Sequence, residues 1–142
     1  MKLIVIRSEK GNISYSDIVE GELSQTVKRI SEEVIKEWDP ELSDFIVLKD
    51  TREVDLPLPL KPELVDMLRR IGSLGRKSTK AVVKFPIYTI SFENMMIDED
   101  KYIENKIYLI APYINDDIKA ELESEAMEIT SQKSPPSGIE AE

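Results

Sequence analysis

The chain has 142 residues, of which 41% are hydrophobic and 33% are charged, with a net charge of −9. This balance is typical of one globular domain, and no apolar run approaches the roughly 20 residues that a membrane-spanning helix needs. The sequence contains neither cysteine nor histidine. It therefore excludes disulfides, zinc sites built from Cys and His, and catalysis by Ser-His-Asp or Cys-His groups.

The first forty residues combine two short apolar runs with one long amphipathic segment. Residues 2–7 predict a buried strand, because they are short, branched and bounded by polar residues. Gly11 and Asn12 indicate a turn into a second, antiparallel strand over residues 13–19. Residues 23–38 place their apolar side chains at helical spacing and predict a helix, which Pro40 ends.

The middle of the chain is punctuated by prolines. Residues 45–49 predict a second buried strand, and residues 50–52 predict a turn after it. The Leu-Pro segment (residues 56–62) contains three prolines, so its first part must be extended. Pro62 is well placed to begin a helix that ends near Gly72.

The following residues are rich in β-formers. Residues 73–80 predict a polar loop, and residues 81–92 predict a strand. Pro86 lies in the middle of that strand, which indicates an edge strand, a bulge or two shorter strands. A helical turn is expected around residues 99–103. Residues 106–114 predict another strand, which would pair with the preceding one as a long hairpin.

A final helix is expected from residues 115–117 to about Glu128, because acids are favoured at the positive end of the helix dipole. Residues 130–142 have the composition of a flexible tail, so residues 1–129 are expected to form the domain. The order of elements predicts a single α+β domain. It would have a mixed, largely antiparallel sheet of about five strands, with about three helices packed on one face.

One basic segment interrupts an acidic chain. Residues 61–80 carry six bases and two acids, a net charge of +4, while residues 1–60 carry −5 and residues 98–142 carry −8. The segment suggests an anion-binding surface for a phosphate of a nucleotide or of a nucleic-acid backbone. Its candidate residues are Arg69, Arg70, Arg76, Lys77 and Lys80. In the alternative interpretation, the first two only stabilise a helix C-terminus and the others are solvated loop charges.

Two other patterns fail the tests that their chemistry sets. Residues 75–79 (GRKST) lack the glycine spacing of a phosphate-binding P-loop and follow a helix instead of a strand. Residues 98–100 (DED) lack the glycine that a calcium-binding loop needs. The sequence therefore predicts no metal site, no cofactor and no catalytic residues.

The sequence is similar in style to small conserved archaeal proteins of unknown function. The similarity rests on MKLIVIR (residues 1–7), on LPLPLKP (residues 56–62) and on a body rich in Ile, Glu and Lys. It extends over the whole chain but implies no residue roles. The abundance of Glu and Lys, with only six Asn and Gln residues, is also typical of proteins from thermophiles.

These exclusions favour a cytoplasmic, non-enzymatic protein-interaction or regulatory domain that forms a homodimer or binds another protein. The strand around Pro86 or the Leu-Pro segment would supply the contact surface. The main alternative is anion or nucleic-acid binding through residues 69–80. A third hypothesis is an enzyme that uses carboxylates, lysine or tyrosine as acid–base groups, although no site is marked. A membrane partner is not expected.

Overall fold

The structure is a computed structural model of the chain. It describes residues 1–38, 40, 44–71, 74–77, 79–93, 96–98, 101–102 and 106–131. Within these residues, strands and helices follow one another in this order: β1 (Lys2–Glu9), β2 (Asn12–Glu20), α1 (Leu23–Ile35), β3 (Asp44–Pro57), α2 (Pro62–Ile71), β4 (Leu74–Lys77), β5 (Lys80–Glu93), β6 (Met96–Asp98), β7 (Lys101–Tyr102), β8 (Lys106–Pro112) and α3 (Asp116–Ser131).

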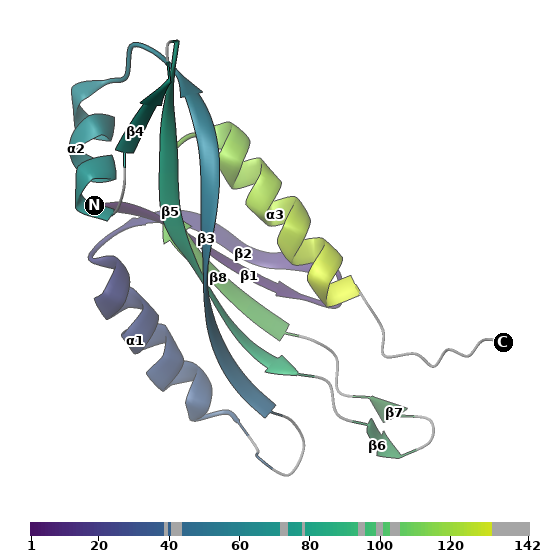
Figure 1. The fold of residues 1–142 in the computed structure, drawn as a ribbon. Coiled ribbons are helices and arrows are strands. Elements are labelled where there is room, and N and C mark those ends of the chain that lie inside the picture. The colour runs from purple at the N-terminus through teal and green to yellow at the C-terminus, as the bar shows by residue number, and fades with distance from the viewer. Residues whose placement is uncertain are drawn as a thin grey trace, which may run out of the picture.

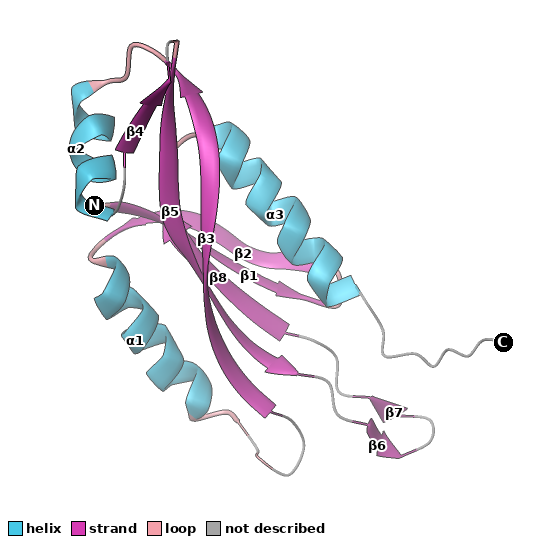
Figure 2. Cartoon of the chain, viewed as in Figure 1, coloured by secondary structure: helices cyan, strands magenta, loops and turns pink. Residues whose placement is uncertain are grey.

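The main sheet has the strand order β2-β1-β8-β5-β3, and β4 pairs with the other side of one end of β5 (Figures 1 and 2). Every pair of neighbouring strands in it is antiparallel. The α+β class, with one main sheet and three helices in the described part of the chain, is confirmed. The expected hairpin of the last two long strands is also confirmed, since Tyr88 lies opposite Ile110 in the ladder of β5 and β8.

The sequence predicted that the helices would pack on one face of the sheet. In the structure they lie on both faces. Ile4 and Ile6 of β1 belong to a buried cluster that includes residues of α2 and α3, whereas Val5 belongs to a second cluster with residues of α1. Successive side chains of a strand point to opposite faces. Because β1, β5 and β8 carry buried apolar residues at both parities, each face of this sheet needs its own helical cover.

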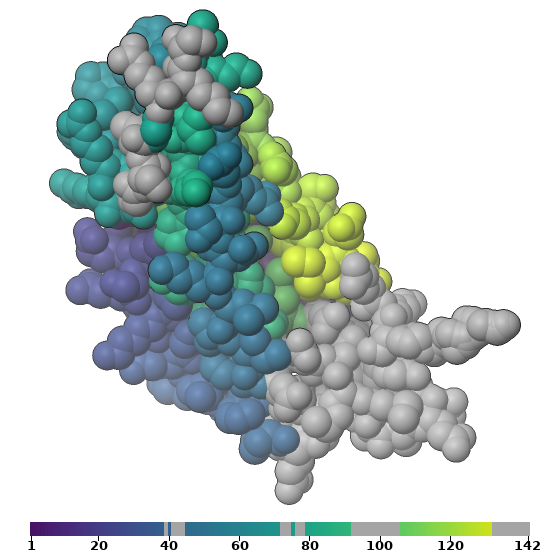
Figure 3. Space-filling view, in the orientation of Figure 1, coloured from purple at the N-terminus to yellow at the C-terminus, as the bar shows by residue number. Residues whose placement is uncertain are grey.

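Strand β3 is a single strand of fourteen residues, so the turn predicted at residues 50–52 is wrong. It pairs with β5 without interruption, from Asp44 opposite Glu93 to Pro57 opposite Lys80. Residues 49–53 are five consecutive polar residues of mixed charge, and this run, which resembled a turn, is the centre of an edge strand. Figure 3 shows β3, in blue, running along the surface of this face of the molecule.

Strand β5 is likewise continuous through Pro86. On the side away from β3, it pairs with β4 up to Val83 and with β8 from Tyr88 onward. No described strand flanks residues 84–87 on that side. Proline has no N–H to donate, so it is tolerated at this locally open edge.

Two other short segments differ from the predictions. Part of the expected loop over residues 73–80 is strand β4. In the region of the expected helical turn, Lys101 and Tyr102 form strand β7, which pairs with β6. Residues 99, 100 and 103 of that turn lie outside the described residues.

Helix α3 is fixed to the β1–β2 turn by a buried polar contact. The hydroxyl oxygens of Ser8 and Thr130 lie 2.7 Å apart, and the Gly11 N–H donates to Thr130 Oγ1 over 3.1 Å. Gly11 has φ +77°, and a Cβ there would lie 3.0 Å from the Cβ of Ser131. Residues 130 and 131 therefore belong to the helix and not to the predicted tail. Residues 132–142 of that tail lie outside the described part.

Side chains of α3 also bind the sheet at both edges. Arg52 of β3 donates to both carboxylate oxygens of Glu125 over 2.6 Å, and this bond raises the pKa of the guanidinium. At the other edge, the Ser16 hydroxyl of β2 donates to Glu123 and lowers the pKa of that carboxyl. Helix α3 thus connects the two edge strands.

Replacing Thr130 by valine tests the buried contact. The Thr130→Val variant keeps the shape but leaves the Gly11 N–H and the Ser8 hydroxyl without this partner. We expect the free energy of unfolding, measured with chemical denaturant, to fall by about 1–3 kcal/mol. The control is Ser131→Ala, which changes an exposed hydroxyl and should stay within about 0.5 kcal/mol of the parent. Equal effects of the two variants would contradict this account.

Candidate functional site

The backbones of the five predicted anion-binding residues fall into two groups. Arg69 and Arg70 lie exposed in the last turn of α2, and Lys80 is the exposed first residue of β5. For Arg76 and Lys77 the structure describes only the backbone, which lies in β4 opposite Ala81 and Lys80.

The chain direction separates these residues into two groups. Strand β4 runs back from the C-terminal end of α2 toward the β4–β5 turn, as Figure 1 shows. There the Leu58 N–H donates to the Thr79 carbonyl over 3.4 Å, which ties the turn to the segment that leads into the start of α2. Arg69 and Arg70 thus lie at one end of α2, and Lys80 lies near the other.

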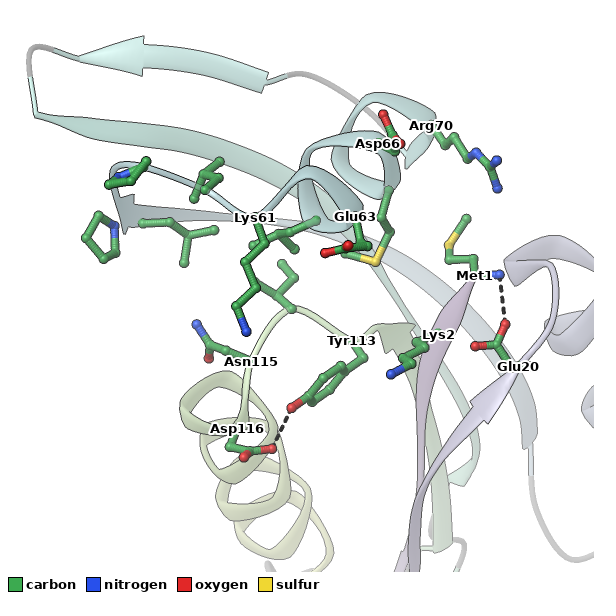
Figure 4. Close-up of a pocket in the computed structure, with 17 residues that line it drawn as sticks. Met1, Lys2, Glu20, Lys61, Glu63, Asp66, Arg70, Tyr113, Asn115 and Asp116 are labelled. Atoms are coloured by element: carbon green, nitrogen blue, oxygen red, sulfur yellow. Dashed lines mark hydrogen bonds and ion pairs between the residues drawn. The ribbon is translucent and has the colours of Figure 1, made fainter.

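A cavity of about 890 Å³ lies beside α2 (Figure 4). It is enclosed by the Leu-Pro segment, by α2, by the ends of β1 and β2, and by the junction between β8 and α3. Its lining includes apolar side chains from three of these elements: Leu56, Pro57, Pro59, Leu60, Leu64, Met67 and Ile114. This volume is in the range that holds a small molecule or a few side chains of a partner.

The local sequence explains why apolar residues line this cavity. Leu56 is the last buried residue of β3, and the prolines after it keep the chain extended along the rim. Helix α2 turns Leu68 into the core, while Leu64 and Met67 remain partly buried beside the cavity. The helix thus has one apolar face that covers the core and also forms a wall of the cavity.

Three basic side chains line the cavity without an ion pair among the described residues: Lys2, Lys61 and Arg70. In Figure 4 the Lys61 amine points toward Asn115, and Lys2 lies beside Tyr113. Two of the acidic side chains that line the cavity already have a partner within the chain. Glu20 lies 3.3 Å from the amine of Met1, and Asp116 accepts a hydrogen bond from Tyr113.

The junction between β8 and α3 is held by three hydrogen bonds. The Tyr113 N–H donates to the Lys2 carbonyl over 2.9 Å, which ties the junction to β1. Asn115 caps α3 by accepting from the Ile118 N–H over 2.9 Å. The Tyr113 hydroxyl donates to Asp116 Oδ1 over 2.6 Å, and this bond to a carboxylate raises the pKa of the phenol.

This arrangement is suited to binding. The apolar wall can bury side chains, and the positive charges of Lys2 and Lys61 at the same cavity would attract an anionic group. Among the described residues, no group of three or more Asp and Glu side chains is arranged to hold a metal ion. None of the helices in the described part is long and apolar enough to cross a membrane.

Sequence reasoning identified part of this site. The Leu-Pro segment was a candidate contact surface, and residues 115–117 were the expected start of the last helix. Lys2 and Tyr113 were missed, because they approach the segment only through the ladder of β1 and β8, where Leu3 lies opposite Pro112. The hydrophobic pattern of single strands does not reveal which strands pair.

Comparison with known families covers nearly the whole chain. A family model described as an uncharacterized protein conserved in archaea, DUF2286, matches residues 2–131. The chain belongs to this family. The resemblance to conserved archaeal proteins is thereby confirmed. No curated protein and no solved structure matches the chain of this DUF2286 member.

The Tyr113–Asp116 bond predicts an alkaline titration specific to this site. The Tyr113 phenol should titrate above about 10, the usual value, because Asp116 stabilises its protonated form. Its contribution to stability is present below pH 10 and is lost as the pH rises through the folded-state pKa. Subtracting the absorbance titration of Tyr113→Phe from that of the parent isolates this group.

Asp116→Asn should bring the midpoint back toward 10, since the amide has no charge. Asp117→Asn is the matched control on the same helix turn. In this variant the Tyr113 titration should keep the raised midpoint of the parent. Identical midpoints for the parent and Asp116→Asn would contradict the assignment.

Proposed function

We propose that this protein is a cytoplasmic, non-enzymatic protein-interaction domain that forms a homodimer and holds an extended segment of a partner protein in the cavity beside the Leu-Pro segment. The observation that carries this proposal is the combination, in one cavity, of an apolar wall with two lysines that form no ion pair with any described residue. Partner binding through such a surface would be the basis of a regulatory role.

The shape of the cavity favours an extended segment as the occupant. A volume of about 890 Å³ accommodates a few side chains but not a folded domain. Pro57 and Pro59 lack N–H groups, so this part of the rim offers side-chain surface more than backbone donors. Recognition would then depend on apolar side chains of the segment packed on Leu60, Leu64 and Met67.

The charges favour a carboxylate on that segment. The chain as a whole carries −9 and repels acidic partners at long range. Lys2 and Lys61 make a local exception, because neither forms an ion pair with a described residue. An acidic side chain placed beside the apolar wall would find both amines at the rim.

Binding of a nucleic acid or another anion remains the second candidate function. It is favoured by the exposure of Arg69, Arg70 and Lys80, which make no ion pair within the described part of the chain. It is weakened by their separation into two groups at opposite ends of α2. Lys84, the next cation along β5, lies 3.9 Å from Glu53 and is balanced by it.

The test is affinity capture from a native lysate, in halves with and without nuclease, with bound proteins identified by mass. The variant is Lys61→Glu, which reverses one charge at the cavity rim. The matched control is Lys28→Glu, the same reversal on the exposed side of α1, away from the cavity. We expect a partner that survives nuclease, binds the parent and Lys28→Glu equally, and is reduced about tenfold or more by Lys61→Glu.

Two results would contradict the proposal. Equal capture by both variants would show that the cavity does not select the partner. Loss of all partners on nuclease treatment, together with affinity that falls steeply with salt, would favour nucleic-acid binding instead.

A further inference from the structure

Strand β3 leaves one long edge of the main sheet open. Its inner side pairs with β5 along all fourteen residues. On its outer side, no described strand or helix is paired with it. In the space-filling view of Figure 3, β3 lies at the surface along its length. An unpaired row of N–H and C=O groups is a template for another strand.

The direction of the hydrogen-bonding groups at the centre of β3 is fixed by two observations. Thr51 lies opposite Pro86, which has no N–H to offer it. The Thr51 N–H instead donates to the side chain of the preceding residue, Asp50, over 2.8 Å. The N–H and C=O of Thr51 therefore point to the open edge, and those of its two neighbours point to β5.

Symmetry limits how a second copy can pair here. Two copies of one strand pair antiparallel about a two-fold axis perpendicular to the sheet. Residues directly opposite one another must lie on the same face, so the axis passes through a residue that pairs with itself. Each possible register is then defined by that one residue.

We infer that a second copy of this chain docks on β3 with the two-fold axis at Thr51. This proposal rests on the homodimer of the proposed function and specifies its interface. Lys49 then lies opposite Glu53 of the second copy, and Asp50 lies opposite Arg52. Each of the thirteen residues from 45 to 57 then lies opposite a residue of the second copy, because Thr51 is the central residue of this range.

The charges of β3 select this register over its neighbours. An axis at Lys49, Asp50, Arg52 or Glu53 would set that charge against its own copy. An axis at Leu48 would set Lys49 against Val47 and Asp50 against Ile46. Only the axis at Thr51 brings both bases of the strand opposite acids, and like charges directly opposite one another are unfavourable.

The same register accounts for an exposed apolar side chain. Leu48 is 58% exposed, the highest value among the exposed large hydrophobic residues of the described part. It would lie opposite Val54 of the second copy, on the face that carries α3. One neighbouring pair, Val47 opposite Asp55, forms neither an apolar contact nor an ion pair in this register.

The charged groups around the axis are compatible with the pairing. On the face of α3, Arg52 already binds Glu125 and Glu121, and Asp50 of the second copy would join these acids. Asp50 can leave the Thr51 N–H, because the Thr51 carbonyl of the second copy accepts that N–H. On the other face, Lys49 lies over the Tyr88 ring and Glu53 lies near Lys84, with both groups exposed.

The other sheet edge offers no such match. Strand β2 has an aspartate in the same role, since the Ile18 N–H donates to Asp17 Oδ1 over 2.8 Å. Its charged residues are Asp17 and Glu20, and it has no base. No register of β2 with its own copy pairs opposite charges.

A single engineered cysteine tests the register, because the chain has no cysteine of its own. Residues that pair with both hydrogen bonds lie about 5.5 Å apart at Cα, within the range of a disulfide. With a mild oxidant, Thr51→Cys should form covalent dimers in high yield. The control is Glu53→Cys on the same exposed edge. It should stay largely monomeric, because its own copy lies about 13 Å away along the strand.

Charge reversal tests the pairs themselves. Lys49→Glu and Glu53→Lys should each weaken the dimer about tenfold in analytical ultracentrifugation, because each creates two like-charge contacts. The double variant restores both contacts and should return the dissociation constant to within about threefold of the parent. Circular dichroism checks that the variants, changed only at exposed positions, remain folded.

Three results would overturn this interface. They are a parent chain that stays monomeric, a dimer that is indifferent to the single charge reversals, and equal disulfide yields for Thr51→Cys and Glu53→Cys. The cavity is judged separately, by the capture experiment with Lys61→Glu. An indifferent dimer would leave the proposed homodimer standing and reject only this edge.

Discussion

The pairing of β3 with β5 is the constraint on which the rest of the structure depends. Fourteen residue pairs align these strands, and their alternation sends Val54 and Leu56 toward α2 and α3. It sends Phe45 toward the face of α1. The ladder ends at Pro57, where the chain leaves the sheet to form the cavity rim. The same ladder uses only one side of β3, so the outer edge stays open.

In this acidic chain, the open edge of β3 and the cavity each bring together charges that could attract a partner. Two copies that each carry −9 repel one another, so a dimer needs local charges of opposite sign in register. In the proposed interface, the alternating charges of Lys49, Asp50, Arg52 and Glu53 would supply them without adding net charge. At the cavity, Lys2 and Lys61, which form no ion pair with a described residue, would attract a carboxylate of the proposed partner. The two sites meet at Leu56 and Pro57, where the strand ends and the rim of the cavity begins.

The sequence predicted the elements better than their arrangement. The helical spacing of residues 23–38 and the proline at residue 62 located α1 and α2, because those signals are local, although α1 ends at Ile35, three residues before the predicted end. Residues 50–52 were misassigned, because the mixed charges of an edge strand resemble those of a turn. The division of the helices between the faces depends on strand pairing. Lys2 and Tyr113 were not predicted as part of the site, because their position also depends on strand pairing. The Leu-Pro segment was recognised from its local sequence alone.

Amide hydrogen exchange along β3, followed by NMR in dilute solution, tests the central claim most directly. One continuous strand paired on one side predicts slow exchange at even-numbered residues from 46 to 56, whose N–H groups point to β5. In the monomer, which dilution favours, odd-numbered residues should exchange faster, and this alternation should continue without a break through residues 50–52. Fast exchange at both Asp50 and Arg52 would restore the turn and contradict the account.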